Sequence, residues 1–232
     1  MERIANNFFL AIVVFLSLSL AVLSLPRLVS AITVIYPNAV HESLLYSETP
    51  ANELMLKAKV KTEDALSWND NSNYWLQIGN FLQTLIWSDE YSKDEYLAMN
   101  VVADKANQAC LKLSVVEPYV WYRLAINRFI VNENDVEIIN LLKFSIYTGR
   151  MEPNLLILRL YFLSKYIDYF DKEMVGLVED QIRLAWLLKT HQLLDTVISI
   201  PTLRPLVYDA LDSDELLIFN KRFEKTIQKN NR

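Results

Sequence analysis

Residues 117–124 read EPYVWYRL and residues 152–159 read EPNLLILR, so each stretch opens with Glu-Pro before an apolar run. Proline is tolerated in the first turn of a helix, where its missing N–H would have no intrahelical partner. Both stretches are therefore predicted helix starts, and they lie 35 residues apart. A period near 34 residues with two helices per unit is the spacing of tetratricopeptide repeats.

A second repeat-like signal is a tryptophan followed by a small residue four positions later. The segments Trp75–Gly79 (WLQIG) and Trp121–Ala125 (WYRLA) share it, because a small residue lets two helices approach closely. Trp121 is expected to pack on the preceding helix. The two segments lie 46 residues apart, and 156–160 matches poorly, so the array is irregular. We predict an irregular, tetratricopeptide-like array of helical hairpins, with a plain irregular helical bundle as the alternative.

The composition supports an all-α fold. The 232 residues include only three glycines, whereas phosphate-binding loops and the tight turns of βαβ units need glycine. The formal net charge is −5, which does not favour nucleic acid as a partner. Cys110 is the single cysteine, so neither an intrachain disulfide nor a cysteine zinc site can form, and its place in an apolar helical stripe predicts burial.

The N-terminal region contains a candidate membrane span. Phe8–Leu25 (FFLAIVVFLSLSLAVLSL) is 18 residues long and carries no charge. A helix of that length spans about 27 Å, close to the hydrocarbon thickness of a bilayer. We predict that the chain contacts the lipid bilayer through Phe8–Leu25 as a single-pass anchor.

A secretory signal peptide is the alternative for the same region. Val29-Ser30-Ala31 has the small-x-small pattern of a cleavage site after Ala31. The apolar run is longer than a usual signal core, and Pro26 and Arg27 stand before the cleavage point. An uncleaved anchor is the favoured interpretation. The short N-terminus and the long C-terminal body predict N-in topology, with the body on the periplasmic side of a bacterial inner membrane.

These features predict three regions. Residues 1–31 are the anchor or signal segment, residues 32–49 a juxtamembrane linker, and residues 50–228 the helical-repeat domain. Near the end of the third region, Asp212–Glu215 is predicted to cap the last helix.

The sequence offers no catalytic, cofactor-binding or metal-binding signature. His41 and His191 form no His-x-x-x-His or carboxylate-x-x-His pair, and His191 is expected to end a long helix. Carboxylates gather at 168–173 and 179–180, where they read as solvated faces. A glycosidase needs two carboxylates across a cleft, one of them with a raised pKa.

The best candidates for an interaction site lie in the C-terminal third. Arg183, Trp186, Arg204 and Tyr208 could form a basic and aromatic patch, since aromatic faces and arginine forks suit sugars and carboxylates. Gln181 is the other polar member of the Trp186 helix. The alternative is a core tryptophan with structural arginines at a helix join.

Arg204 precedes Pro205, and proline disfavours the helical region for the residue before it. Arg204 is therefore predicted to be extended and to lie outside the helix that Pro205 starts.

Three segments carry a resemblance to a known family: Gln181–Trp186 (QIRLAW), Leu203–Val207 (LRPLV) and Glu117–Ala125 (EPYVWYRLA). The chain resembles the short, single-pass, helical-repeat polysaccharide biosynthesis proteins of the VpsP kind, which accompany bacterial exopolysaccharide machinery. The resemblance implies a role in making or exporting a surface polysaccharide, and it brings no catalytic residues.

The sequence thus predicts a membrane-anchored scaffold without enzymatic activity or cofactor. Its expected partners are cell-envelope proteins of polysaccharide assembly, with an acidic polysaccharide as a further candidate. The alternatives are a carbohydrate-active enzyme of the envelope, either a glycoside hydrolase or a lyase, and a secreted periplasmic adaptor.

Overall fold

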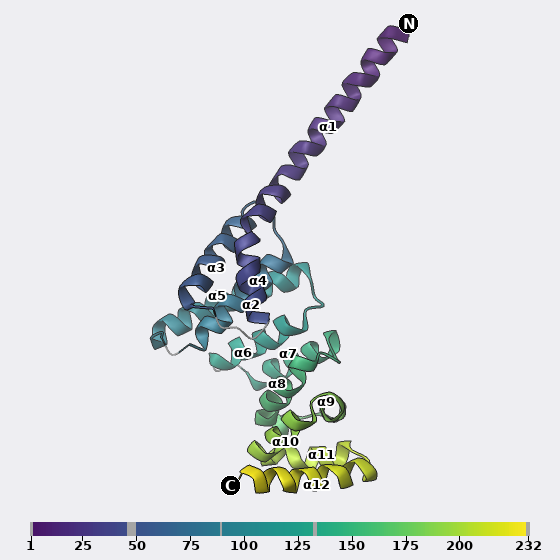
Figure 1. The fold of residues 1–232 in the computed structure, drawn as a ribbon. Coiled ribbons are helices and arrows are strands. Elements are labelled where there is room, and N and C mark those ends of the chain that lie inside the picture. The colour runs from purple at the N-terminus through teal and green to yellow at the C-terminus, as the bar shows by residue number, and fades with distance from the viewer. Residues whose placement is uncertain (1, 46–49, 89, 132–133, 231–232) are drawn as a thin grey trace. The chain divides into compact units, whose positions relative to one another are not determined.

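The computed structural model describes residues 2–45, 50–88, 90–131 and 134–230, which form twelve α-helices and no β-strand (Figure 1). The predicted all-α class is confirmed. Helices follow one another through short connections, as a helical-repeat fold requires. The chain divides into two compact units, residues 1–113 and residues 114–232. The boundary between them falls inside the range 50–228, which was predicted to be one helical-repeat domain.

The N-terminal unit consists of five helices whose sequence neighbours pack on one another. These are α1 (Glu2–Thr33), α2 (Ile35–Leu45), α3 (Asn52–Leu66), α4 (Ser72–Ile86) and α5 (Lys93–Leu113). Helix α5 begins at a capping box, in which the Ser92 N–H donates to Glu95 Oε2 at 2.9 Å. Cys110 on this helix is buried, as predicted.

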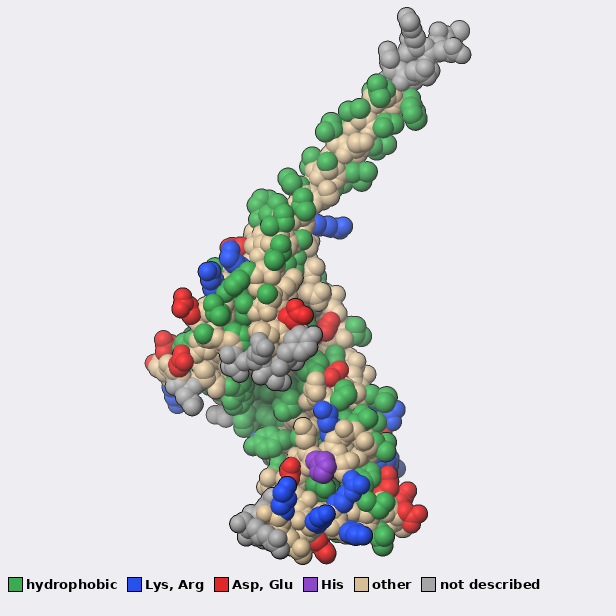
Figure 2. Space-filling model, viewed as in Figure 1, with side chains coloured by type: hydrophobic (Ala, Val, Ile, Leu, Met, Phe, Trp, Pro, Cys, Tyr) green, Lys and Arg blue, Asp and Glu red, His purple; other side chains and the backbone are tan. Residues whose placement is uncertain are grey.

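Helix α1 is exposed along most of its length. Residues Phe9–Thr33 contain an 18-residue window with a mean hydropathy of 2.5 and are long and apolar enough, by length and composition, to cross a membrane. The large apolar side chains from Phe9 to Leu28 are all at least 41% exposed, and Figure 2 shows them around the helix. Nothing in the described part of the chain covers this surface.

The end of α1 belongs to the folded unit. Ser30 is fully buried and its hydroxyl accepts a hydrogen bond from the Tyr74 hydroxyl at 3.4 Å, while Val34 is 3% exposed. Helix α2 then packs on α3 and α4. The segment 32–49, expected to be a linker, is thus helical over Ile35–Leu45, and residues 46–49 lie outside the described residues. Helix α2 forms because apolar residues such as Val40 pack into the hydrophobic core of the N-terminal unit.

The small residue of the WLQIG segment has the predicted effect. A Cβ atom placed on Gly79 would lie 2.5 Å from Oδ1 of Asn107, so α4 approaches α5 closely at this point. Ala125, the matching residue of WYRLA, is fully buried in the C-terminal unit.

The C-terminal unit surrounds one large hydrophobic core. Its elements are α6 (Pro118–Ile130), α7 (Asp135–Thr148), α8 (Pro153–Leu163), the 3₁₀-helix η1 (Ser164–Tyr169), α9 (Lys172–Leu188), α10 (Thr190–Ser199), the 3₁₀-helix η2 (Pro201–Leu203), α11 (Arg204–Ala210) and α12 (Ser213–Asn230). Helices α6 and α8 begin at Pro118 and Pro153, as the two Glu-Pro stretches predicted.

Trp121 packs differently from the expectation. Its ring stacks on Phe144 of α7, the following helix, with centroids 4.9 Å apart, and its Nε1 donates to the Val115 carbonyl at 2.8 Å. The side chain is only half-buried, because Phe144 itself is 48% exposed.

We therefore expect Trp121→Ala to lower the free energy of unfolding by about 2 kcal/mol, which combines a stacked pair with one hydrogen bond. A double-mutant cycle with Phe144→Ala, read from denaturant unfolding, should show a coupling of about 1 kcal/mol. A coupling below about 0.3 kcal/mol would show that the stacking contributes nothing.

Candidate interaction surface

The predicted interaction residues all lie on α9 and α11, in the C-terminal unit. Aspartate side chains cap the N-termini of α9 and of the neighbouring helix α12. The Asp171 carboxylate accepts from the Met174 N–H at 2.7 Å at the start of α9. Asp212 Oδ1 accepts from the N–H groups of Asp214 and Glu215 at 3.0 and 2.8 Å, so the predicted cap of α12 is present.

Three of the five predicted residues meet in one place. Trp186 of α9 lies edge-on to Phe219 of α12 at 5.9 Å, and Tyr208 of α11 lies edge-on to the same ring at 6.4 Å. Arg204 and Arg222 lie over aromatic rings of this group. We call it the cation–aromatic cluster: Trp186, Arg204, Tyr208, Phe219, Arg222 and Phe223.

Arg204 differs from its prediction. It has φ −57° and ψ −46°, which is right-handed helical, and it is the first residue of α11. Proline disfavours this conformation in the preceding residue without forbidding it. The contacts of the side chain favour it here, since the guanidinium lies 5.0 Å from the Phe223 ring centroid and donates to the Tyr208 hydroxyl at 3.2 Å.

Arg204→Ala is expected to lower the free energy of unfolding by about 0.5–1 kcal/mol, the usual size of an exposed cation–aromatic contact. Thermal unfolding beside Lys221→Ala, an exposed cation on α12 for which no ring contact is found among the described residues, provides the comparison. A loss above about 2 kcal/mol would mean that Arg204 has a mainly structural role.

Gln181 lies elsewhere, in the interior. It is fully buried; its Nε2 donates to the Arg150 carbonyl at 2.9 Å and its Oε1 accepts from Arg159 Nη1 at 3.1 Å. Both ends of the side-chain amide are hydrogen-bonded, the nitrogen to the turn between α7 and α8 and the oxygen to α8. Gln181 is thus positioned to hold this turn, and a partner outside the unit cannot reach it without local unfolding.

Arg159 is the residue that the sequence analysis missed. Its guanidinium is fully buried and donates to the carbonyls of Ser145 and Gly149 at 2.5 and 2.9 Å. These carbonyls end α7, where a cation is favoured by the helix dipole. The sequence did contain a signal for this burial. Arg159 lies four residues after Leu155 and four before Leu163, so it shares a helix face with two buried leucines.

Burial lowers the pKa of Arg159 to about 10, and the neighbouring Glu152 and Tyr119 oppose part of that effect. The guanidinium still carries its charge at neutral pH. Its hydrogen-bond partners are oxygen atoms of uncharged groups, so it makes a structural contact rather than an ion pair with a carboxylate.

Arg183 is exposed on the other side of α9. Its Nε donates to the Ala210 carbonyl at 2.7 Å, so it satisfies the last turn of α11. It also lies 3.7 Å from Glu179, one turn earlier on its own helix. Arg183 therefore joins α9 to α11 and is separate from the cation–aromatic cluster.

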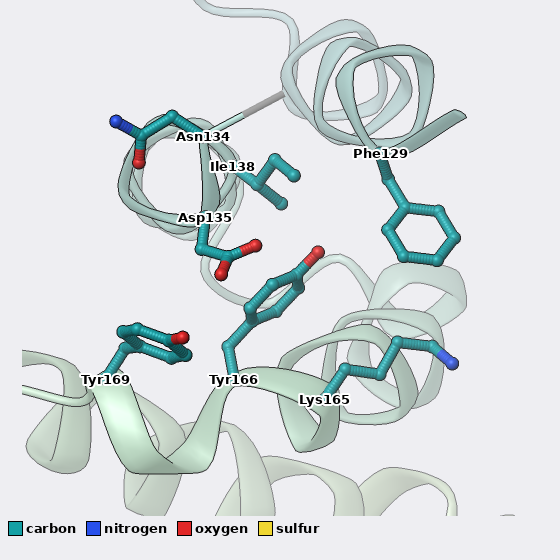
Figure 3. A pocket seen from close by; sticks show the side chains of 7 residues that line it. All are labelled: Phe129, Asn134, Asp135, Ile138, Lys165, Tyr166 and Tyr169. Carbon is teal, nitrogen blue, oxygen red and sulfur yellow. The ribbon is translucent and has the colours of Figure 1, made fainter. Parts of the chain in front are cut away.

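A pocket of about 600 Å³ lies between α6, α7 and η1 (Figure 3). In Figure 3 Tyr166 reaches from η1 toward Asp135 and Ile138 of α7, while Lys165 and Phe129 lie to one side. Lys165 Nζ lies 5.7 Å from the Phe129 ring centroid. Among the described residues that line the pocket, Asp135 is the one carboxylate, whereas a glycosidase site uses two.

Four of the five carboxylates that gather at 168–173 and 179–180 lie beside cations, namely Asp171, Glu173, Glu179 and Asp180. Lys143 donates to Asp171 at 2.8 Å and to Glu173 at 2.9 Å, and Arg150 pairs with Asp180. The Lys143 contact lowers the pKa of Asp171, and the Tyr147 hydroxyl followed by Lys143 lowers that of Glu173. A general acid needs the opposite shift, so these groups suit salt bridges better than glycoside chemistry.

His191 does not end the long helix, since α9 stops at Leu188 and His191 lies in the first turn of α10. Within the described residues no group of three or more His, Cys, Asp and Glu side chains is arranged to hold a metal ion. No family model matches the chain, and neither a curated protein nor a solved structure matches it.

Proposed function

We propose that the chain is a membrane-anchored, non-enzymatic scaffold acting in the biosynthesis or export of a bacterial surface polysaccharide. In this proposal α1 crosses the cytoplasmic membrane with its N-terminus inside, and the helical units on the periplasmic side bind cell-envelope proteins of polysaccharide assembly. The polysaccharide part of the proposal comes from the resemblance of Gln181–Trp186 and Leu203–Val207 described above.

The observation that carries the anchor is the exposed apolar surface of α1. Soluble proteins rarely expose apolar patches of more than a few hundred Å², and a helix of this length satisfies its own backbone hydrogen bonds inside a bilayer. Lipid is the natural cover for apolar side chains that the described chain leaves bare from Phe9 to Leu28.

The burial of Ser30 supports an uncleaved anchor. Cleavage after Ala31 would remove the Ser30 side chain, which is fully buried and bonded to Tyr74. The same helix that leaves the bilayer would then be part of the folded unit, so the scaffold would be confined to the membrane surface. Confinement raises the effective concentration of each bound partner without any new contact.

Complementation tests this proposal. In a strain lacking the protein, the full chain should restore surface polysaccharide, and so should a chain whose residues 1–28 are replaced by an unrelated single-pass helix. A chain carrying a cleavable signal peptide instead should restore much less, because the scaffold would diffuse away from the membrane.

Equal restoration by the released form would support the secreted adaptor. Unchanged polysaccharide in the deletion strain would contradict the proposed role altogether. Mass spectrometry of the mature protein should find peptides that span Ala31, and an N-terminus at Ile32 would exclude the uncleaved anchor.

A further inference from the structure

A groove of about 560 Å³ lies between α10 and α12, next to the cation–aromatic cluster. Buried Leu194 forms part of its floor. Cationic side chains line one wall, and Figure 2 shows Lys and Arg side chains gathered over these last helices. The lining residues are His191, Leu194, Asp195, Arg222, Lys225, Thr226 and Lys229.

No ion pair among the described residues neutralises the cations of this wall, Arg222, Lys225 and Lys229, although the whole chain has a net charge of −5. Residues 216–232 hold five Lys and Arg against one Glu. The helix dipole explains a cation in the last turn, where Lys229 lies, but its effect fades before Lys225 and Arg222.

The three cations form a row. They occupy positions i, i+3 and i+7 of α12, so they share one face and extend about 10 Å along the helix axis. Arg222 lies at one end of the row, with its guanidinium 5.7 Å from the Trp186 ring centroid. An arginine fork binds a carboxylate through two parallel hydrogen bonds, and lysine supplies point charges beside it.

We propose that this groove binds a linear, carboxylate-bearing sugar chain. The proposal rests on the proposed role in polysaccharide assembly and adds the ligand class and the site. Repeated charges on a linear polymer match a row of cations along one wall. A lipid surface is broad and contacts cations that project from a convex face, whereas these cations line a recess.

Asp195 provides the sharpest test, because it is the one acidic residue among the described residues that line the groove. It repels an anionic ligand, so Asp195→Asn should strengthen binding by about two- to threefold. A gain of affinity cannot arise from misfolding.

The double substitution Lys225→Gln with Lys229→Gln removes two cations from the groove. It should weaken binding of the anionic polymer about tenfold and make the affinity less dependent on salt. The control is Lys221→Gln with Lys172→Gln, which changes the net charge equally at exposed positions outside the groove. It should weaken binding less than twofold.

Calorimetric titration of the detergent-solubilised full chain with polygalacturonate measures these effects, with dextran as the uncharged polymer. The proposal is overturned if polygalacturonate does not bind, if dextran binds equally, or if the control variant loses as much as the groove variant. It is also overturned if vesicles containing phosphatidylglycerol bind through Lys225 and Lys229 and polygalacturonate does not compete. Failure here would leave the complementation result unaffected, so the two proposals can fail separately.

Discussion

Arg159→Ala is expected to lower the free energy of unfolding of the C-terminal unit by about 3–5 kcal/mol. The substitution leaves a cavity and removes the donors to buried Ser145 and Gln181, and one of the donors to the Gly149 carbonyl. Each buried acceptor left without a partner costs about 1–3 kcal/mol, and the lost volume adds to that cost. Denaturant unfolding followed by far-ultraviolet circular dichroism measures the change.

Arg150→Ala is the matched control, because Arg150 lies at the same turn with a side chain that is 62% exposed. Its ion pair with Asp180 is screened by solvent, so the substitution should change the free energy of unfolding far less than Arg159→Ala does. Arg159→Met separates the cost of the cavity from the cost of the lost hydrogen bonds, since methionine keeps most of the side-chain volume and none of the donors. If Arg159→Ala costs no more than Arg150→Ala, the buried arginine does not hold the turn between α7 and α8.

Replacing Leu16 and Leu20 of α1 with arginine should release the chain from the membrane. Each arginine at the centre of a spanning helix costs about 3 kcal/mol, so the pair removes about 6 kcal/mol of insertion free energy. Both leucines are exposed, at 54% and 67%, so neither contributes to the packing of the folded unit. Carbonate extraction followed by immunoblotting measures how the protein divides between the membrane pellet and the supernatant.

The control replaces the same two leucines with alanine, which keeps the segment free of charge. That variant should stay in the membrane pellet with the unmodified chain. Circular dichroism of the body should be the same in all three proteins. Retention of the arginine variant in the pellet would show that something other than α1 holds the chain at the membrane.

Several features follow from local sequence alone. Prolines after Glu117 and Glu152 predicted where α6 and α8 begin, because proline is tolerated at a helix start and disfavoured inside one. Asp212 predicted the cap of α12, because its carboxylate reaches N–H groups two and three residues away. The charge-free, mostly apolar run from Phe8 to Leu25 predicted α1, since lipid requires only length and hydrophobicity.

Long-range features did not follow. Periodicity shows which face of a helix is apolar but not which helix covers it, so Trp121 was assigned to the wrong neighbour. Helix α2 was not predicted for the same reason. The apolar pattern of 32–49 is weak, and the helix is stabilised by packing on α3 and α4.

Polar residues give the clearest contrast. Gln181, Arg204 and Tyr208 looked alike from the sequence, as polar groups in a helical third of the chain, but Gln181 is buried and the other two are exposed. Arg159 drew no attention because a charge predicts exposure. Its burial depends on carbonyls at the end of α7, which arrive only when the chain folds back.

The sequence by itself determined the helical class, the helix starts and the apolar segment, because each depends on contacts within about four residues. Only the tertiary structure decided the division at residue 113, the burial of Arg159 with Gln181, and the groove between α10 and α12. These depend on side chains more than ten residues apart. The free energy of such contacts comes from burial and hydrogen bonding that no local pattern specifies.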